Sequence, residues 1–100
     1  MPMQKRPEDV ETVELYLSLG SNQGDRRLNI EYAVSMLNIE LKKPYKAISS
    51  LLETEPWGFE SEDKFLNAVV LYELALPKGY NAEAEGLMIL EICKDIERKL

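Results

Sequence analysis

The stretch SSLLETEPWGFESEDKFLNAVV, residues 49–70, holds two runs of strand-forming residues on either side of an eleven-residue connection, residues 54–64. This connection is too long for a tight hairpin turn. It contains a proline and a glycine, which interrupt regular structure, beside Trp57 and Phe59, which are unfavourable to leave in water. A structured loop with aromatic side chains between two strands is well suited to hold a flat ligand.

Phe65 and Asn67 follow this connection directly, at positions i and i+2 of the second run. In a strand these positions share a face, so an aromatic ring and a carboxamide are expected to point the same way. A carboxamide can donate to and accept from the edge of a heterocycle while a ring stacks on its face. The alternative, which stays open on the residues alone, is that Asn67 bonds to loop backbone and that Phe65 is an ordinary core residue.

Composition places the chain among small globular domains. Its 100 residues, 45% hydrophobic and 30% charged, suffice for one domain with one core. The net charge of −6 argues against non-specific binding to nucleic acid or to an anionic membrane. No apolar run is long enough to span a membrane and the N-terminus has no signal-peptide core, so we expect a cytoplasmic protein. The single cysteine, Cys93, and the lack of histidine exclude an internal disulfide and the usual zinc clusters.

Hydrophobic periodicity divides the chain into a leader and one domain, residues 1–11 and 12–100. The pattern predicts strands over residues 12–19, 45–53 and 65–76, a helix after Asp25 with buried Ile30, Ala33, Val34 and Leu37, and a helix after Asn81 with buried Ile89, Ile92, Cys93, Ile96 and Leu100. Both faces of the strand over residues 65–76 are mostly apolar, so we expect it to be central and covered on both sides, at least near its start. Residues 20–25 are expected to form a turn between the first strand and the first helix.

The predicted order of strand, helix, strand, strand and helix is typical of an α+β, ferredoxin-like (split β-α-β) two-layer sandwich, β-α-β-β-α with the fourth strand absent. In this fold the first strand would lie beside the third and the fourth. Because the fourth strand is absent, one edge of the first strand is expected to be open. We expect that two chains can pair along this edge and form a homodimer.

Four motifs resemble the 6-hydroxymethyl-7,8-dihydropterin pyrophosphokinase family of folate biosynthesis. The motifs are LSLGSNQGDR at residues 17–26, SSLLETEPWG at residues 49–58, FLNAVV at residues 65–70 and IER at residues 96–98. Together they extend over residues 13–100, in the order and spacing of the N-terminal two-thirds of the family.

This resemblance implies transfer of pyrophosphate from ATP to a reduced pterin, with Mg²⁺. It assigns pterin binding to Gly20, Thr54, Glu55, Trp57, Phe65 and Asn67, and an approach to ATP to Lys94 and Glu97. The family's arginine-rich loop and its magnesium-binding aspartate pair have no counterpart in this sequence, so no catalytic or metal-binding residue is assigned and ATP binding is doubtful.

Two classes of function remain open. The chain is either a pterin pyrophosphokinase or a fragment of one, inactive as these 100 residues, or a non-catalytic pterin-binding or regulatory module of the same fold.

Overall fold

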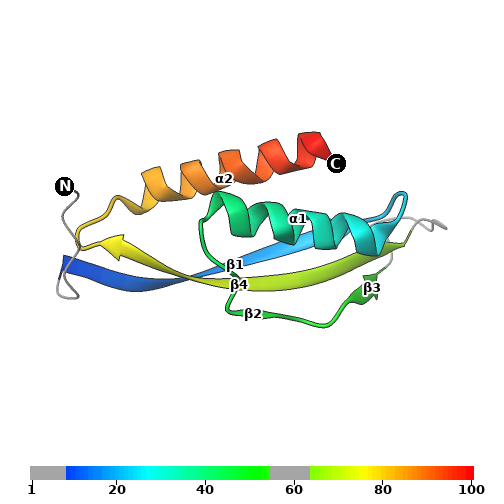
Figure 1. Ribbon diagram of the computed structural model, residues 1–100, viewed down its shortest axis with the longest axis horizontal. Coiled ribbons are helices and arrows are strands. Elements are labelled where there is room, and N and C mark those ends of the chain that lie inside the picture. The colour runs from blue at the N-terminus through cyan, green and yellow to red at the C-terminus, as the bar shows by residue number, and fades with distance from the viewer. Residues whose placement is uncertain (1–8, 55–63) are drawn as a thin grey trace.

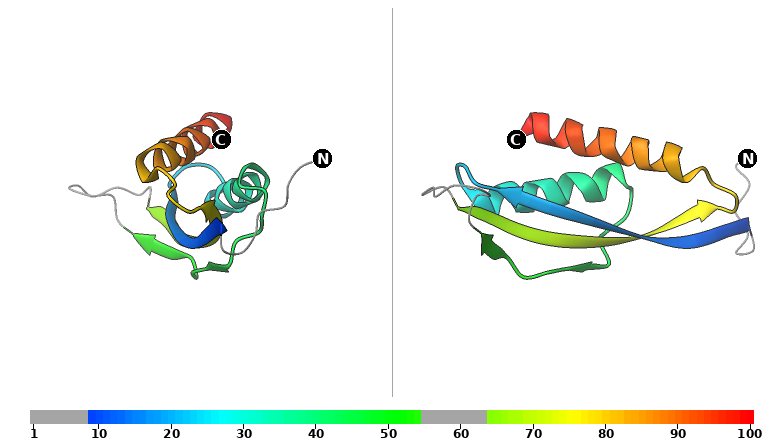
Figure 2. Two further views of the ribbon diagram at one scale, coloured as in Figure 1. Left: turned by 90° about the vertical axis from the view of Figure 1, so that its left-hand side faces the viewer. Right: turned by 180° about the vertical axis from the view of Figure 1, so that it is seen from behind.

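The computed structural model describes residues 9–54 and 64–100, which form two layers: an antiparallel sheet and two helices packed on one of its faces (Figures 1 and 2). The elements are β1 (Val10–Ser21), α1 (Arg26–Glu40), β2 (Ala47–Ile48), β3 (Leu52–Thr54), β4 (Phe65–Pro77) and α2 (Ala82–Lys99). This is the predicted α+β architecture, compatible with a ferredoxin-like split β-α-β sandwich. The first strand begins at Val10, two residues before the expected start, and it runs on through Gly20 and Ser21, which we had expected in the turn.

The pairing of β1 with β4 forms the body of the sheet. The two strands are antiparallel along the whole of β1, from Val10 opposite Pro77 to Ser21 opposite Leu66. β4 is central, with β1 on one side and the short strands β2 and β3 on the other. Side chains alternate between the two faces of the ladder, so one face of each strand meets the helices and the other does not.

The core lies between the sheet and the helices. Its buried residues are Ile30, Ala33, Val34 and Leu37 of α1, Ala68, Val70 and Tyr72 of β4, and Ile96 of α2. The hydroxyl of the fully buried Tyr72 donates to Asn38 Oδ1 at 2.6 Å, and burial raises the pKa of Tyr72 to about 12. The predicted stripe on α1 is thus confirmed in full.

The predicted stripe on α2 is confirmed only in part. Ile96 is buried, whereas Leu100 is 55% exposed. Figure 1 shows α2 rising away from the sheet towards its C-terminal end. Because this end of α2 stands off from the sheet, Leu100 does not reach the core.

The expected continuous strand over residues 45–53 is interrupted. Ile48 opposes Val70 and Leu52 opposes Asn67, so the three residues 49–51 face only two residues of β4. This is the geometry of a β-bulge, which inserts one residue into one of two paired strands. At the bulge, Ser49 Oγ accepts a hydrogen bond from the Val69 amide at 2.8 Å, and the Ser49 amide donates to the Val69 carbonyl at 2.9 Å.

The expectation that β4 is covered on both sides was wrong. Both helices pack on the same face of the sheet, as the end-on view in Figure 2 shows. On the opposite face Val69 is 43% exposed and Tyr16 of β1 is 62% exposed. The helix-free face of the sheet is therefore exposed at Val69 and Tyr16, while Phe65 and Asn67 on the same face are half-buried.

Both predicted helix caps are confirmed. Asp25 accepts from the Leu28 amide and Asn81 accepts from the Ala84 amide, which satisfies one free donor at the start of each helix. In the turn before α1, Gly24 has φ of +63°, a left-handed conformation that favours glycine.

No helix within residues 9–54 and 64–100 has the length and the apolar character needed to cross a membrane.

The outer edge of β1 generates the first testable prediction. Among the described residues β1 pairs with β4 alone, so its second edge carries backbone donors and acceptors that another strand could bind. We expect the purified chain to form dimers through this edge. Sedimentation equilibrium should show association between micromolar and near-millimolar concentration, and a monomer throughout that range would contradict the expectation.

Candidate functional site

Three of the candidate site residues meet on the helix-free face of the sheet. Gly20 of β1 lies directly opposite Asn67 of β4. A Cβ atom built on Gly20 would lie 2.8 Å from Asn67 Oδ1 and 3.5 Å from Phe65 Cδ1. Both side chains therefore lie over the backbone of Gly20, as the shared strand face of Phe65 and Asn67 predicts.

Thr54 joins this group from β3. It lies opposite Phe65 in the ladder, and its Oγ1 accepts a hydrogen bond from Asn67 Nδ2 at 2.6 Å. The same nitrogen lies 3.4 Å from the Leu52 carbonyl. Both hydrogens of the carboxamide thus have acceptors within β3, so the partners of Asn67 are a strand hydroxyl and a strand carbonyl, and not the loop backbone of the alternative. The carboxamide oxygen, Asn67 Oδ1, lies above Gly20 and can accept a hydrogen bond.

The two remaining candidates on this side, Glu55 and Trp57, lie outside the described residues.

Arg26, the first residue of α1, connects the two strands that flank this site. Its Nη1 donates to Glu53 Oε1 of β3 at 3.1 Å and to the carbonyl of Lys64, next to β4, at 2.8 Å. The Arg26 side chain is 32% exposed, in contrast to 74% for the adjacent Arg27, which pairs with Glu31 one turn along α1. Arg26 is therefore held between the helix layer and the sheet.

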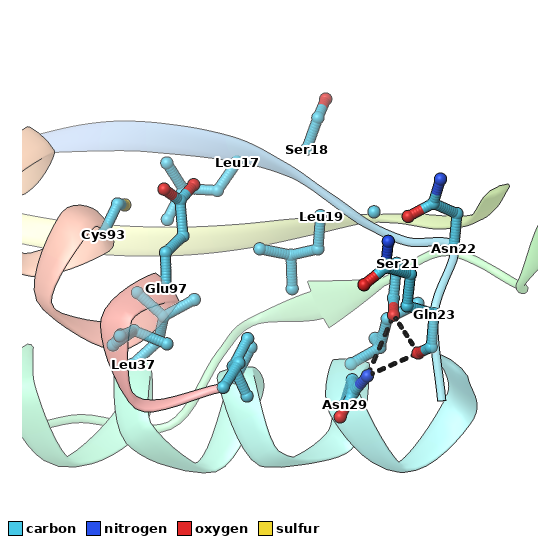
Figure 3. A pocket seen from close by; sticks show the side chains of 15 residues that line it. Leu17, Ser18, Leu19, Ser21, Asn22, Gln23, Asn29, Leu37, Cys93 and Glu97 are labelled. Carbon is cyan, nitrogen blue, oxygen red and sulfur yellow. Dashed lines mark hydrogen bonds between the residues drawn. The ribbon is translucent and has the colours of Figure 1, made fainter. Parts of the chain in front are cut away.

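A second region lies on the other side of β1, where a cavity of about 340 Å³ opens between β1 and the two helices (Figure 3). Leu17 and Leu19 line it from β1, and Cys93 and Glu97 line it from the last turns of α2. Gly20 belongs to this lining too, so this glycine separates the cavity from the group around Asn67.

The turn between β1 and α1 forms the end of this cavity. Asn29 Nδ2 donates to Ser21 Oγ and to the Gln23 carbonyl, each at 3.0 Å, as the dashed lines in Figure 3 show. Asn29 thus fixes the turn to the first part of α1. Asn22 lies between Ser21 and Gln23, the two residues that Asn29 binds.

The structure brings only one of the two expected ATP-side residues to the cavity. Glu97 is in its lining, whereas Lys94 is exposed on α2 and is not. Burial, and next the nearby Glu97 carboxylate, raise the pKa of the Cys93 thiol. Cys93 packs against the core cluster, and a raised pKa lowers the fraction of thiolate, the form that a nucleophile requires.

Within the part of the chain that the structure describes, no three or more cysteine, aspartate or glutamate side chains gather closely enough to hold a metal ion. We therefore assign no magnesium ligand among those residues.

Comparison with known proteins identifies the family to which this site belongs. A family model described as 7,8-dihydro-6-hydroxymethylpterin-pyrophosphokinase matches residues 16–100. The chain belongs to this pyrophosphokinase family. The resemblance seen in the four sequence motifs is thereby confirmed.

Curated relatives of the family carry the corresponding names. The 2-amino-4-hydroxy-6-hydroxymethyldihydropteridine pyrophosphokinase of Porphyromonas gingivalis is 43% identical over 86 residues, which is 86% of this chain and 52% of the relative. The Bacillus subtilis enzyme of the same name is 33% identical over 85% of this chain and 46% of the relative. The Folic acid synthesis protein fol1 of Schizosaccharomyces pombe is 33% identical over 85% of this chain, which corresponds to 10% of that protein. The chain thus spans about half the length of the bacterial pyrophosphokinases that it matches.

Sequence reasoning missed the residues that hold the candidate site together, chiefly Arg26 and Asn29. The sequence contained one feature that pointed to Arg26. A cation at the first position of a helix is unfavourable with the helix dipole, and a residue that breaks a local rule is a candidate for a long-range role. Asn29 carried no such signal, because an asparagine in the first turn of a helix is unremarkable.

The contact between Gly20 and Asn67 generates a prediction. A methyl group at Gly20 would push Asn67 Oδ1 away and break the bond from Asn67 to Thr54, at a cost of about 1 kcal/mol. Replacing a strand glycine by alanine returns about 0.5–1 kcal/mol through the unfolded chain. We expect Gly20→Ala to leave the free energy of unfolding nearly unchanged, while the side-chain amide resonances of Asn67 shift in an NMR spectrum.

Ser18→Ala, on the same face of β1, is the matched control and should leave those resonances in place. A Gly20→Ala variant that retains the wild-type Asn67 resonances would contradict the proposed contact.

Proposed function

We propose that this chain forms the pterin-binding part of a 6-hydroxymethyl-7,8-dihydropterin pyrophosphokinase, which transfers pyrophosphate from ATP to the hydroxymethyl group of a reduced pterin. The observation that carries the proposal is the convergence of Gly20, Thr54, Phe65 and Asn67 on the accessible face of the sheet. The names of the bacterial relatives agree with this reading.

The chemistry of these residues suits a pterin, which is flat and has alternating donors and acceptors along one edge. The ring of Phe65 offers a surface for stacking. Asn67 Oδ1 is an acceptor for an N–H group, because Asn67 Nδ2 is engaged by Thr54 and Leu52. Gly20 has no side chain, so it leaves the space that Asn67 Oδ1 occupies over β1. Backbone groups of Thr54, Glu55 and Trp57 would complete the edge.

The cavity on the other side of β1 is the proposed approach for ATP, with Glu97 in its lining; Lys94, the second expected residue, is not in that lining. Its volume of about 340 Å³ is at the lower end of the range for small-molecule sites. A carboxylate accepts hydrogen bonds and repels phosphate, so Glu97 suits a hydroxyl or amino group of a nucleotide and not its phosphates. Magnesium, which the family uses with ATP, would supply positive charge that offsets the charge of the phosphates.

We further propose that these 100 residues do not catalyse the transfer by themselves. The reaction requires carboxylates directed at magnesium and cations directed at phosphate. Two cationic side chains near the two regions are already engaged with carboxylates: Arg26 with Glu53, and Arg98 with Asp95. The alternative function, a pterin-binding or regulatory module that never catalyses, shares the same binding face.

The binding half of the proposal predicts that Asn67→Ala weakens pterin binding by about 1–3 kcal/mol, because an N–H group of the ligand loses its acceptor. Titration calorimetry with 6-hydroxymethylpterin and with guanosine is the measurement. Heat is expected for the pterin and not for the nucleoside, and Ser35→Ala, an exposed change on α1, should bind like the wild type. Equal and negligible heats for both compounds would reject pterin recognition.

The catalytic half is tested by AMP formation from ATP, magnesium and reduced hydroxymethylpterin with the purified chain. We expect no turnover above background. A rate near the ordinary enzymatic value of about 1 s⁻¹ would show that the chain contains catalytic groups that we have not assigned.

A further inference from the structure

The first helix begins with two arginines in an unfavourable position. Arg26 and Arg27 occupy the first turn of α1, which contains no acidic residue, although the positive end of the helix dipole favours anions there. Arg27 is compensated locally, by Glu31 on the same helix. Arg26 is compensated by partners outside the helix, 27 and 38 residues further along the chain. The unfavourable position of Arg26 is offset only by residues far along the chain, which indicates that Arg26 has a role in the fold or in the site.

Both partners of Arg26 flank residues 55–63. One nitrogen, Nη1, carries two hydrogens, so it can donate to the Glu53 carboxylate and to the Lys64 carbonyl at the same time. The first bond holds β3 and the second holds the residue before β4. Arg26 therefore fixes the distance between the ends of two chain segments that meet at the proposed pterin site.

Side chains of β3 point alternately to the two faces of the sheet, and this alternation transmits the restraint from one face to the other. β3 has only three residues, all exposed, and it lies at an edge, so it is held by its short pairing with β4 and by the bond from Arg26. Because neighbouring residues in a strand face opposite ways, the Glu53 side chain meets α1 on one face while Thr54 meets Asn67 on the other. Holding Glu53 thus holds the hydroxyl of Thr54, which in turn orients the Asn67 carboxamide.

The first turns of α1 also fix the other border of the site. Asn29, three residues after Arg26, binds Ser21 and Gln23 and so restrains the chain that leaves Gly20 (Figure 3). One end of α1 therefore holds the β1 side and the β3 side of the same site.

We infer that Arg26 is a positioning residue for the pterin site: through Glu53 and Lys64 it holds β3 in the register in which Thr54 orients Asn67. The inference rests on the proposed pterin recognition. It adds a residue that does not touch the ligand and whose effect on binding is transmitted through β3.

The test compares Arg26→Met, which removes the charge and both bonds, with Arg26→Lys, which retains a cationic donor. Arg27→Met is the matched control, because it removes a neighbouring arginine that has no partner in the sheet among the bonds above. The first readout needs no ligand: amide hydrogen exchange of Glu53, Thr54 and Phe65. Arg26→Met should raise the exchange rate of these amides by about tenfold, as expected for loss of a charge-assisted hydrogen bond. Arg26→Lys should give a rate between those of Arg26→Met and the wild type. Arg27→Met should exchange like the wild type.

The second readout is the dissociation constant for 6-hydroxymethylpterin. It should rise by about tenfold in Arg26→Met and far less in Arg26→Lys. If Arg26→Met shows faster exchange but the wild type binds no pterin, the proposed function is rejected and the restraint of Arg26 on β3 is retained. Arg26→Met behaving like Arg27→Met in both readouts would overturn the inference itself.

Discussion

The continuous ladder between β1 and β4 is the interaction on which the remaining structure depends. It determines which side chains of both strands meet the helices, and it places Gly20 opposite Asn67. A slip of one residue would turn Leu17 and Leu19 away from the core, so the burial of that face fixes the register. The glycine at the end of β1 and the carboxamide at the start of β4 are brought together by the same apolar pattern that stabilises the sheet.

The bulge at residues 49–51 has a comparable effect on the opposite side of β4. Without its extra residue, Glu53 and not Thr54 would share a face with Asn67, because residues opposite each other in a ladder point the same way. The bulge thus directs the hydroxyl of Thr54 to the carboxamide and the carboxylate of Glu53 to Arg26. A hydroxyl can orient Asn67 without bringing negative charge to the ligand, whereas Glu53 in that place would do so.

Much of this arrangement could be predicted from local sequence. The order of elements, the caps at Asp25 and Asn81, the core stripe of α1 and the common face of Phe65 and Asn67 all follow from periodicity and from single residues. They depend on interactions within a few residues, which a sequence shows directly.

The features that could not be predicted depend on pairing over long separations. The bulge arises from the register of two strands, and the hydrogen bonds of Arg26 join residues 27 and 38 positions apart. The uncovered face of β4 was misjudged because Val69 and Leu71 are apolar on a face that the helices do not reach. The pairing of Asn67 with Thr54 also required the observed register, because residue spacing alone leaves the partner of the carboxamide open.

The most direct test of this account is to follow a titration with reduced hydroxymethylpterin by NMR, residue by residue. The account predicts that the largest changes in chemical shift occur at Gly20, Thr54 and the side-chain amide of Asn67, with little change at Ala33 in the core. Changes confined to Cys93 and Ile96, in the cavity on the other side of β1, would contradict the placement of the pterin on the helix-free face. The absence of any change would contradict pterin recognition altogether.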